Sequence, residues 1–273
     1  MKTLRLNNRI LLPSAAVILG ILMIFPIYLL VISSLRSETN VFDFNLLPTA
    51  FEFSNFKEAW IGSGLPRSIA NSLIVSGTVT AVAMIFHAMS GYALARFRFP
   101  GKTIMFAWML STLMVPFAVI MIPLYLITKN LGLANSYAGL IIPSIFNAYG
   151  IFLFRQFYMD FPKELEEAGY MEGLSLSGTF FRLALPLSVP IMVPLTIGFF
   201  LTNWNAYMWP LIITQDESLW VVQQRLAHLV GGGYFTPWNV VLAAAVVVAI
   251  PTFILFFVAQ KYLVEGIKMS GIK

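Results

Sequence analysis

Six long stretches without Asp, Glu, Lys or Arg constrain the fold of this 273-residue chain more than any other feature. A helix that crosses a bilayer needs about 20 apolar residues, and every one of these stretches reaches that length. Backbone polar groups in lipid must be satisfied internally, which favours helices. The sequence therefore predicts an all-α integral membrane protein with six transmembrane helices. The charge-free stretches are 10–35, 68–95, 103–128, 130–154, 183–215 and 226–260.

The composition agrees with a single transmembrane domain over residues 1–273. Hydrophobic residues make up 59% of the chain and charged residues 11%, far from the usual fractions of a soluble domain. We expect a cytoplasmic loop at 155–183 and an extracytoplasmic loop at 205–237. Prolines recur within the spans and predict kinks, although they could equally serve packing alone. The expected helices are approximately 10–34, 68–95, 103–127, 137–154, 184–204 and 238–260.

The distribution of Lys and Arg predicts the orientation. The first nine residues hold three basic residues ahead of an apolar run that is too long for a secretory signal, so we expect an uncleaved first helix. With this end inside, alternation of six helices puts 12 of the 17 Lys and Arg residues on the cytoplasmic side. The bias predicts that both termini are cytoplasmic. It also accounts for the net charge of +5 without a nucleic-acid partner.

The sequence lacks the chemistry of a catalyst or an ion-coupled pump. All 12 acidic residues fall in expected loops or tails, and a lone buried histidine such as His87 is more often a packed neutral side chain than a proton relay. Gly101-Lys102-Thr103 resembles the end of a phosphate-binding loop, but Arg96 stands where that motif needs its first glycine. No zinc-protease or nucleophile-elbow motif occurs. We therefore expect no enzyme activity, metal or bound cofactor, and an energy source in a partner.

An acidic segment at 162–173 is the best candidate for the contact with that partner. Pro162 suits a helix start and Gly173 a helix stop, while three glutamates in the first turns complement the helix dipole. Ala168 and Gly169, with Gly173, would leave one side nearly bare, so that a protein surface could approach closely. A solvated charged loop explains the composition equally well. The glutamates are Glu164, Glu166 and Glu167.

The order of residues in this region resembles the EAA loop of ATP-binding-cassette (ABC) importer permeases. Glu164-Leu165-Glu166-Glu167-Ala168-Gly169 is followed by Gly173 and then by Leu185-Pro186-Leu187-Ser188-Val189-Pro190. Three positions depart from the family pattern: Gly169 and Leu174 replace alanines, and Glu172 replaces an aspartate. Further motifs are similar to the carbohydrate-uptake branch, in particular to the second permease of maltose-type systems. They are Asn71-Ser72-Leu73, 91–96, 99–101, Pro123-Leu124-Tyr125, Leu131-Gly132-Leu133, Trp204-Asn205, Trp209-Pro210-Leu211 and the ending 260–266.

The resemblance implies an assembly in the cytoplasmic membrane of a prokaryote. Its other members would be a second permease subunit, two ABC ATPase subunits that bind ATP and Mg, and an extracytoplasmic solute-binding protein. Closure of the ATPase dimer would move the coupling helix and open the pathway outward. The outer loop from Gln215 to Pro237, including Gly231, Gly232 and Gly233, would contact the binding protein and could enter its cleft. The implied ATPase-coupling residues are Glu164, Glu166, Glu167, Ala168, Gly169, Glu172 and Gly173.

The resemblance implies a sugar or oligosaccharide as the solute. Sugars need hydrogen bonds and aromatic faces, which polar and aromatic residues near the fourth and fifth helices could supply. Structural roles such as helix capping are equally open for each of them. The alternatives are another polar solute on the same architecture, such as a glycerol phosphodiester or an oligosaccharide acid, and a six-helix channel or enzyme unrelated to ABC importers. The candidate pathway residues are Asn147, Tyr149, Asn203, Trp204, Asn205 and Tyr207.

Overall fold

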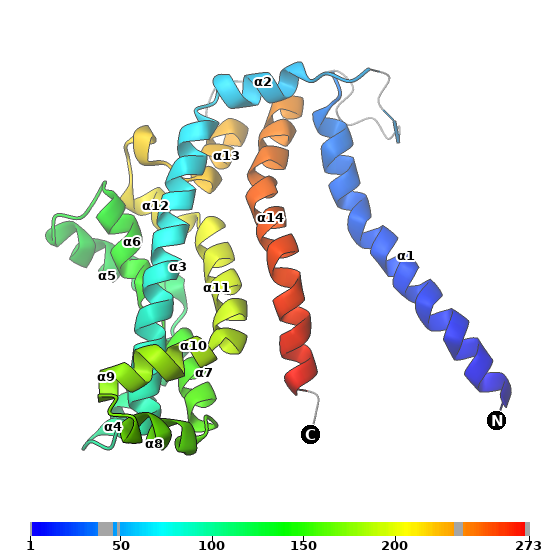
Figure 1. Ribbon diagram of the computed structural model, residues 1–273. Coiled ribbons are helices and arrows are strands. Elements are labelled where there is room, and N and C mark those ends of the chain that lie inside the picture. The colour runs from blue at the N-terminus through cyan, green and yellow to red at the C-terminus, as the bar shows by residue number, and fades with distance from the viewer. Residues whose placement is uncertain (1, 38–45, 48–49, 232–236, 271–273) are drawn as a thin grey trace. The chain divides into compact units, whose positions relative to one another are not determined.

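The computed structural model describes residues 2–37, 46–47, 50–231 and 237–270, and the regular structure in these ranges is entirely helical (Figure 1). The chain forms two compact units. Unit 1 comprises Met1–Pro66 and Arg225–Ile250, and unit 2 comprises Arg67–Gln224 and Pro251–Lys273.

Unit 1 contains α1 (Lys2–Ser34) and α2 (Ser54–Ile61), together with the later part of α13 (Val222–Gly231) and the first part of α14 (Trp238–Ser270). Two buried asparagines tie these elements together. Asn55 donates to the carbonyl oxygens of Ser34 and Arg36 at 2.9 Å each. Asn239 donates to the Asn55 side chain at 2.8 Å. Most apolar side chains of α1 between Leu11 and Ile27 are exposed, as expected of a helix surrounded by lipid.

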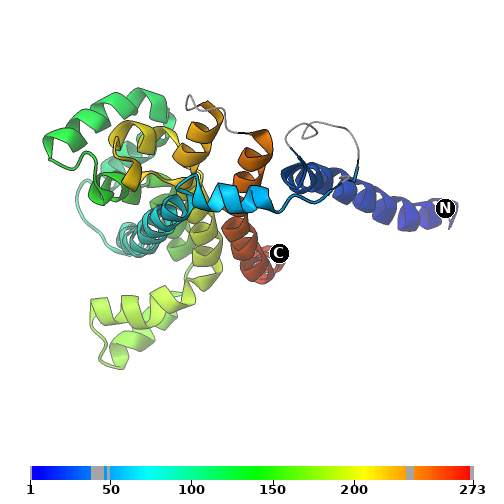
Figure 2. The ribbon, with the colours of Figure 1, turned by 90° about the horizontal axis from the view of Figure 1, so that it is seen from above.

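Unit 2 is built around α3 (Leu65–Arg96), of which it contains all but the first two residues. Seen from above, α5 and α6 project to one side of α3, and α8 and α9 project to another (Figure 2). The other elements of unit 2, besides the end of α14, are α4 (Lys102–Ser111), η2 (Thr112–Met114), α5 (Phe117–Asn130), α6 (Tyr137–Ile145), α7 (Ala148–Met159), α8 (Lys163–Met171), α9 (Leu176–Thr179), η3 (Phe180–Ala184), α10 (Leu185–Leu187), α11 (Val189–Trp204), α12 (Met208–Ile213), η4 (Glu217–Leu219) and the start of α13.

Small residues bring α3 close to its neighbours. A Cβ atom on Gly91 would lie 2.6 Å from the Cβ of Phe154, so only glycine permits this approach of α3 to α7. Gly150 of α7 likewise leaves room for His87 of α3, because a Cβ atom on Gly150 would overlap the His87 ring. The Nε2 of His87 accepts a hydrogen bond from the Asn147 backbone N–H at 3.1 Å. An accepting nitrogen carries no proton, so His87 is a packed neutral side chain. Unit 2 is therefore a bundle in which α3 and α7 make close contact.

The apolar stretches form three continuous helices and three bent pairs. Leu11–Ser34, Leu65–Arg96 and Trp238–Gln260 are each long and apolar enough to cross a membrane. Three further pairs reach that length only together, and the described residues thus hold between three and six spans. The pairs are 102–114 with 117–130, bent by 108°, 137–145 with 148–159, bent by 41°, and 176–187 with 189–204, bent by 75°.

Each bend has a local cause. Val115 is extended because it precedes Pro116, and proline disfavours the helical conformation of the residue before it. The second bend lies at Phe146 and Asn147, both extended, where Asn147 caps α7. The third lies at Ser188, two residues before Pro190. The expected helices at 103–127, 137–154 and 184–204 thus contain breaks, and the expected loop at 205–237 contains α12, η4 and α13.

Candidate functional site

The acidic segment folds into the helix α8. Pro162 lies at the N-cap, one residue earlier than expected, and the helix runs from Lys163 to Met171. Gly173 has a φ of 80°, a left-handed conformation that costs glycine little, and it ends the helix. The Leu174 N–H then donates to the Gly169 carbonyl at 3.0 Å, which satisfies an otherwise unpaired group of the last turn. Figure 1 shows α8 and α9 beside the end of α3.

α8 has one face turned outward and one turned into the protein. Its outward face is formed by Glu164, Leu165, Glu167, Ala168, Met171 and, at the C-cap, Glu172, all of them exposed.

Glu166 and Gly169 are buried, so these two predicted coupling residues do not belong to the outward face. A Cβ on Gly169 would lie 2.7 Å from the Leu183 side chain and 3.4 Å from that of Leu174. The expected bare side formed by Ala168, Gly169 and Gly173 is corrected accordingly: the space beside Gly169 is filled by this chain's own leucines.

A buried ion pair attaches the inward face of α8 to α3. The Nε of Arg96, in the last turn of α3, donates to Glu166 Oε1 at 2.8 Å, and both side chains are about one-tenth exposed, at 10% and 11%. Arg96 Nη2 also donates to the carbonyl oxygen of Phe161, just before α8 begins. Its guanidinium lies 5.9 Å from the centre of the Phe161 ring. One arginine therefore holds both the start and the middle of α8.

A cluster of aromatic rings supports this attachment. Tyr92, one helical turn before Arg96, packs edge-on against Tyr158 of α7 with ring centres 5.2 Å apart. It lies at the same distance from Phe180 of η3. The ring centres of Tyr158 and Phe161 lie 6.3 Å apart. The Tyr158 hydroxyl accepts a hydrogen bond of 2.8 Å from Ser188, which lies at the bend before α11. The rings therefore connect α8 to α3, α7 and α11 by close packing.

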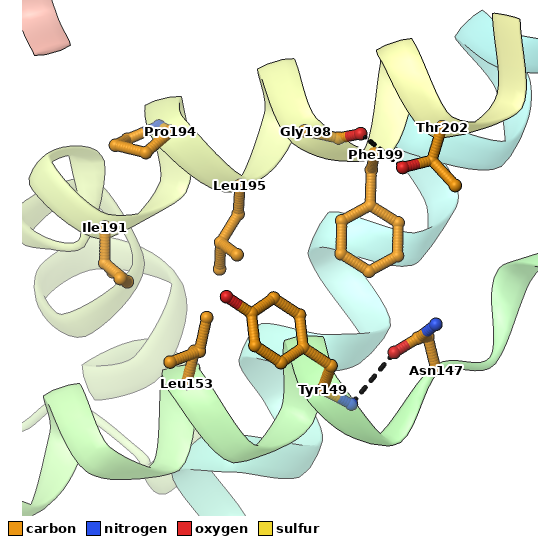
Figure 3. A pocket seen from close by; sticks show the side chains of 9 residues that line it. All are labelled: Asn147, Tyr149, Leu153, Ile191, Pro194, Leu195, Gly198, Phe199 and Thr202. Atoms are coloured by element: carbon orange, nitrogen blue, oxygen red, sulfur yellow. Dashed lines mark hydrogen bonds between the residues drawn. The ribbon is translucent and has the colours of Figure 1, made fainter. Parts of the chain in front are cut away.

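A pocket of about 330 Å³ lies between α7 and α11. Figure 3 shows the ring of Tyr149 lying between the two helices, with Leu195 and Phe199 pointing toward it from α11. Asn147 lies at one end, where its Oδ1 caps α7 by accepting from the Tyr149 N–H at 2.9 Å. Thr202 contributes a hydroxyl that donates to the Gly198 carbonyl. An aromatic face with amide and hydroxyl groups suits a sugar-sized polar solute.

The structure brings only two of the six predicted pathway residues, Asn147 and Tyr149, into this pocket. Trp204 is buried at 1% exposure, and its ring stacks on Phe200. The amide groups of Asn203 and Asn205 donate to carbonyl oxygens of α11. Tyr207 is 37% exposed just before α12. Pro194, Gly198, Phe199 and Thr202 line the pocket although the sequence analysis did not select them.

The opposite end of α3 is held by side chains that bond backbone groups, and among them Arg67 donates from Nε to the Ser218 carbonyl at 3.1 Å. Asn71 donates to the carbonyl oxygens of Ser218 and Trp220 at 2.8 and 2.9 Å, and its Oδ1 accepts from the Tyr137 hydroxyl at 2.6 Å. Asn135, in a left-handed conformation with φ 54°, accepts from two successive N–H groups at 215 and 216 at 3.0 Å each. These contacts fix the segment 214–224, which we name the outer segment.

The outer segment is also ordered within itself. Hydrogen bonds from Ser218 to the Asp216 carboxylate lower the pKa of this exposed group. Gln224 accepts from the Val221 N–H at 3.1 Å and bonds to Thr214. Of the glycines predicted to contact a binding protein, Gly231 ends α13, and Gly232 and Gly233 lie outside the described residues.

These features define the class of protein: a helical membrane subunit with a mostly apolar pocket between its helices, which a tyrosine, an amide and a hydroxyl group also line, and with a short exposed acidic helix held by an internal ion pair. The chain belongs to the family of binding-protein-dependent transport system inner membrane components, whose model matches residues 87–269. It is thus a permease component of such a transport system, and its fold is that of ABC importer permeases.

Characterised relatives match over most of their length. The chain is 30% identical over 270 residues to the arabinooligosaccharides transport system permease protein AraQ of Bacillus subtilis (strain 168), covering 97% of this chain and 96% of the relative. It is 31% identical over 260 residues to the sn-glycerol-3-phosphate transport system permease protein UgpE of Yersinia pestis bv. Antiqua (strain Antiqua), covering 92% of both.

A solved structure has the same fold. A chain in the crystal structure of a bacterial ABC transporter involved in the import of the acidic polysaccharide alginate superposes with a TM-score of 0.84 and 25% identity. The superposition covers 93% of this chain and 97% of that chain. The predicted all-α permease fold and the family resemblance are both confirmed.

Proposed function

We propose that this chain is one of two different permease subunits of an ATP-driven importer that carries a sugar or oligosaccharide across the cytoplasmic membrane of a prokaryote. Two ATPase subunits would bind ATP and Mg on the cytoplasmic side, and a solute-binding protein would deliver the solute on the other. The chain itself would catalyse no reaction. The observation that carries the proposal is α8, which exposes an acidic face while an ion pair holds its other face.

The outward face of α8 is the proposed ATPase contact. Glu164, Glu167 and Glu172 would meet basic groups of the ATPase, and the small side chain of Ala168 would allow close approach. Glu166 and Gly169 would serve coupling indirectly, because they attach α8 to the bundle. A displacement of α8 would then reach α3 through Glu166 and Arg96 and reach α11 through the aromatic cluster, so that ATP-driven movement changes access to the pocket.

The pocket between α7 and α11 is the proposed contact with the solute. Tyr149 would stack on the apolar face of a sugar ring, and the amide nitrogen of Asn147 and the hydroxyl of Thr202 would bond its hydroxyl groups. Asn203, Asn205 and Tyr207 would line the outer approach, whereas Trp204 is buried and would act structurally. The outer segment and the residues that follow it as far as 237, including Gly231, Gly232 and Gly233, would contact the binding protein.

The docking proposal is tested with Glu167→Ala and a matched variant, Glu58→Ala, which removes the same charge from an exposed position on α2. Each variant is co-expressed with the partner subunits, purified and reconstituted in liposomes. Glu167→Ala should reduce co-purification of the ATPase severalfold, and it should reduce solute-dependent ATP hydrolysis to a similar extent. Glu58→Ala should leave both unchanged. Uptake at the full rate by Glu167→Ala, or uptake by the permease chains without ATPase subunits, would contradict the proposed coupling.

A second candidate solute is a glycerol phosphodiester or a related anion, which the similarity to a glycerol-3-phosphate permease favours. Competition for uptake distinguishes the two candidate solutes. Neutral oligosaccharides should inhibit uptake of the native solute in proteoliposomes, and Tyr149→Ala should raise the half-saturating solute concentration more than Tyr149→Phe does. Inhibition by glycerol phosphodiesters alone would replace the sugar with the anionic solute.

A further inference from the structure

Three cations gather where α3 ends, α4 begins and α7 ends. Lys102 Nζ donates to the carbonyl oxygens of Ala95 and Phe97 at 3.3 and 2.9 Å, which caps the C-terminal end of α3. Arg98 directly follows Phe97, whose carbonyl Lys102 binds, and the Arg155 guanidinium of α7 lies over the ring of Phe106, one turn beyond Lys102 on α4. Like charges repel, so this arrangement favours an anionic ligand.

No carboxylate of the described residues pairs with these three cations. Glu166, which lies beside the end of α3, pairs with Arg96 instead. The guanidinium of Arg155 lies 4.1 Å from the centre of the Phe106 ring, which holds it in place without neutralising it. Its Nε is buried and has no hydrogen-bond partner. A buried donor without a partner is uncommon and points to a missing acceptor.

An apolar groove of about 340 Å³ adjoins the cations, between α3, α4 and α7. Its lining residues follow the cations in register: Phe99 comes directly after Arg98, Met105 lies one turn beyond Lys102, and Ile151 lies one turn before Arg155. The groove continues with Ala93 and Met109 along the helices, away from the charged end. Charge at one end and an apolar groove beyond it form an amphipathic site.

We propose that Arg98, Lys102 and Arg155 bind the phosphate of an anionic phospholipid whose acyl chain occupies the adjoining groove. The cations complement the phosphate, and the groove is lined by helices that belong to candidate membrane spans. A soluble anion would leave this apolar groove empty. With the proposed orientation of the chain, the lipid belongs to the cytoplasmic leaflet. This site is separate from the pocket between α7 and α11 and from the outward face of α8.

The test is native mass spectrometry of the full-length chain in detergent, titrated with phosphatidylglycerol or phosphatidylcholine. Phosphatidylglycerol should bind more tightly. Arg98→Gln should weaken it about fivefold and Arg98→Gln with Arg155→Gln about 25-fold, as expected for basic residues at an anionic membrane surface. Lys129→Gln, which removes an exposed cation at the end of α5, should have no effect and serves as the matched control.

A groove variant separates a lipid from a free anion. Ala93→Phe should fill the groove and weaken phosphatidylglycerol binding while the cations remain. Three outcomes would overturn the proposal: equal binding of the two lipids, unchanged binding by Arg98→Gln, or displacement of phosphatidylglycerol by millimolar inorganic phosphate with no effect of Ala93→Phe. The last outcome would identify a site for a soluble anion. Because Arg98 is exposed, its variant should fold even if the double variant does not.

Discussion

At one end of unit 2, α8 is attached to α3 by the Arg96–Glu166 ion pair and by aromatic packing. At the other end, the outer segment is attached by side chains that bond backbone groups. Asn71 and Arg67 of α3 donate to carbonyl oxygens, and Asn135, just before α6, accepts from two N–H groups. Several hydrogen bonds between side chains and backbone groups fix the position of the outer segment. α8 is attached by one ion pair and by ring packing, and apolar packing is less directional than hydrogen bonding. The difference suits a moving input at one end and a fixed surface at the other.

The largest effect should come from breaking the ion pair. Arg96→Ala leaves Glu166 buried without a partner, which costs about 3–5 kcal/mol where such a pair is fully buried. We expect a marked fall in apparent melting temperature in detergent and loss of coupled uptake. Removing both charges, with Arg96→Met and Glu166→Met, should restore much of the stability but not the coupling. If Arg96→Ala melted like the wild type, α8 would not depend on this pair.

The next largest effect should come from placing a leucine on the inward face of α8, and the same substitution on its outward face serves as the comparison. Gly169→Leu forces a side chain against Leu183 and should destabilise the protein by about 1–3 kcal/mol, as overpacking does. Ala168→Leu points outward and should leave the melting temperature unchanged while weakening ATPase binding. Melting curves and co-purification measure the two effects. Equal melting temperatures for the two variants would show that the faces are assigned wrongly.

At the outer end, Asn71→Ala removes two donated bonds, at a cost of about 1–3 kcal/mol. The Ser218 carbonyl keeps the bond from Arg67, so the loss falls mainly on the Trp220 carbonyl. Stimulation of ATP hydrolysis by the binding protein should fall, whereas basal hydrolysis and ATPase co-purification should stay the same. A parallel loss of basal hydrolysis would mean that the two ends are not separate in function.

The smallest effect should come from Tyr137→Phe. This change removes only the hydrogen bond to Asn71 Oδ1 and should cost about 0.5–1.5 kcal/mol. Asn71 keeps both of its donated bonds, so stimulation by the binding protein should be nearly normal. Measured beside Asn71→Ala, it shows how much of the outer attachment depends on the donated bonds. A larger loss in Tyr137→Phe than in Asn71→Ala would reverse that assignment.

The sequence was sufficient to predict the helical membrane fold, the family and the existence of α8. Charge-free stretches and the proline and glycine at the ends of α8 are local signals. The rotation of α8 about its axis could not be predicted, because it depends on Arg96, which lies 70 positions before Glu166 in the sequence. Prolines marked the region of the bend at Pro116, but the angle of 108° depends on how α5 packs.

The candidate pathway was predicted in part for a similar reason. Asn147 and Tyr149 could be selected because polar and aromatic residues stand out in an apolar stretch. Gly198 and Phe199 look like ordinary residues of a buried helix, and only their position opposite Tyr149 gives them a place in the pocket. Asn135 carried a weak signal, an asparagine in a short connection, and its left-handed conformation explains why that residue type suits the position.

The division of α8 into two faces has a consequence for how such transporters diversify. Glu166 pairs with Arg96 and the space beside Gly169 is filled by leucines of the same chain, whereas Glu164, Glu167 and Ala168 are exposed. If α8 docks on the ATPase as proposed, a permease that acquires a different ATPase would adjust the exposed positions one at a time and keep the anchoring positions unchanged. The outer surface of the short helix would then vary with the ATPase, and its inner surface with the rest of the permease.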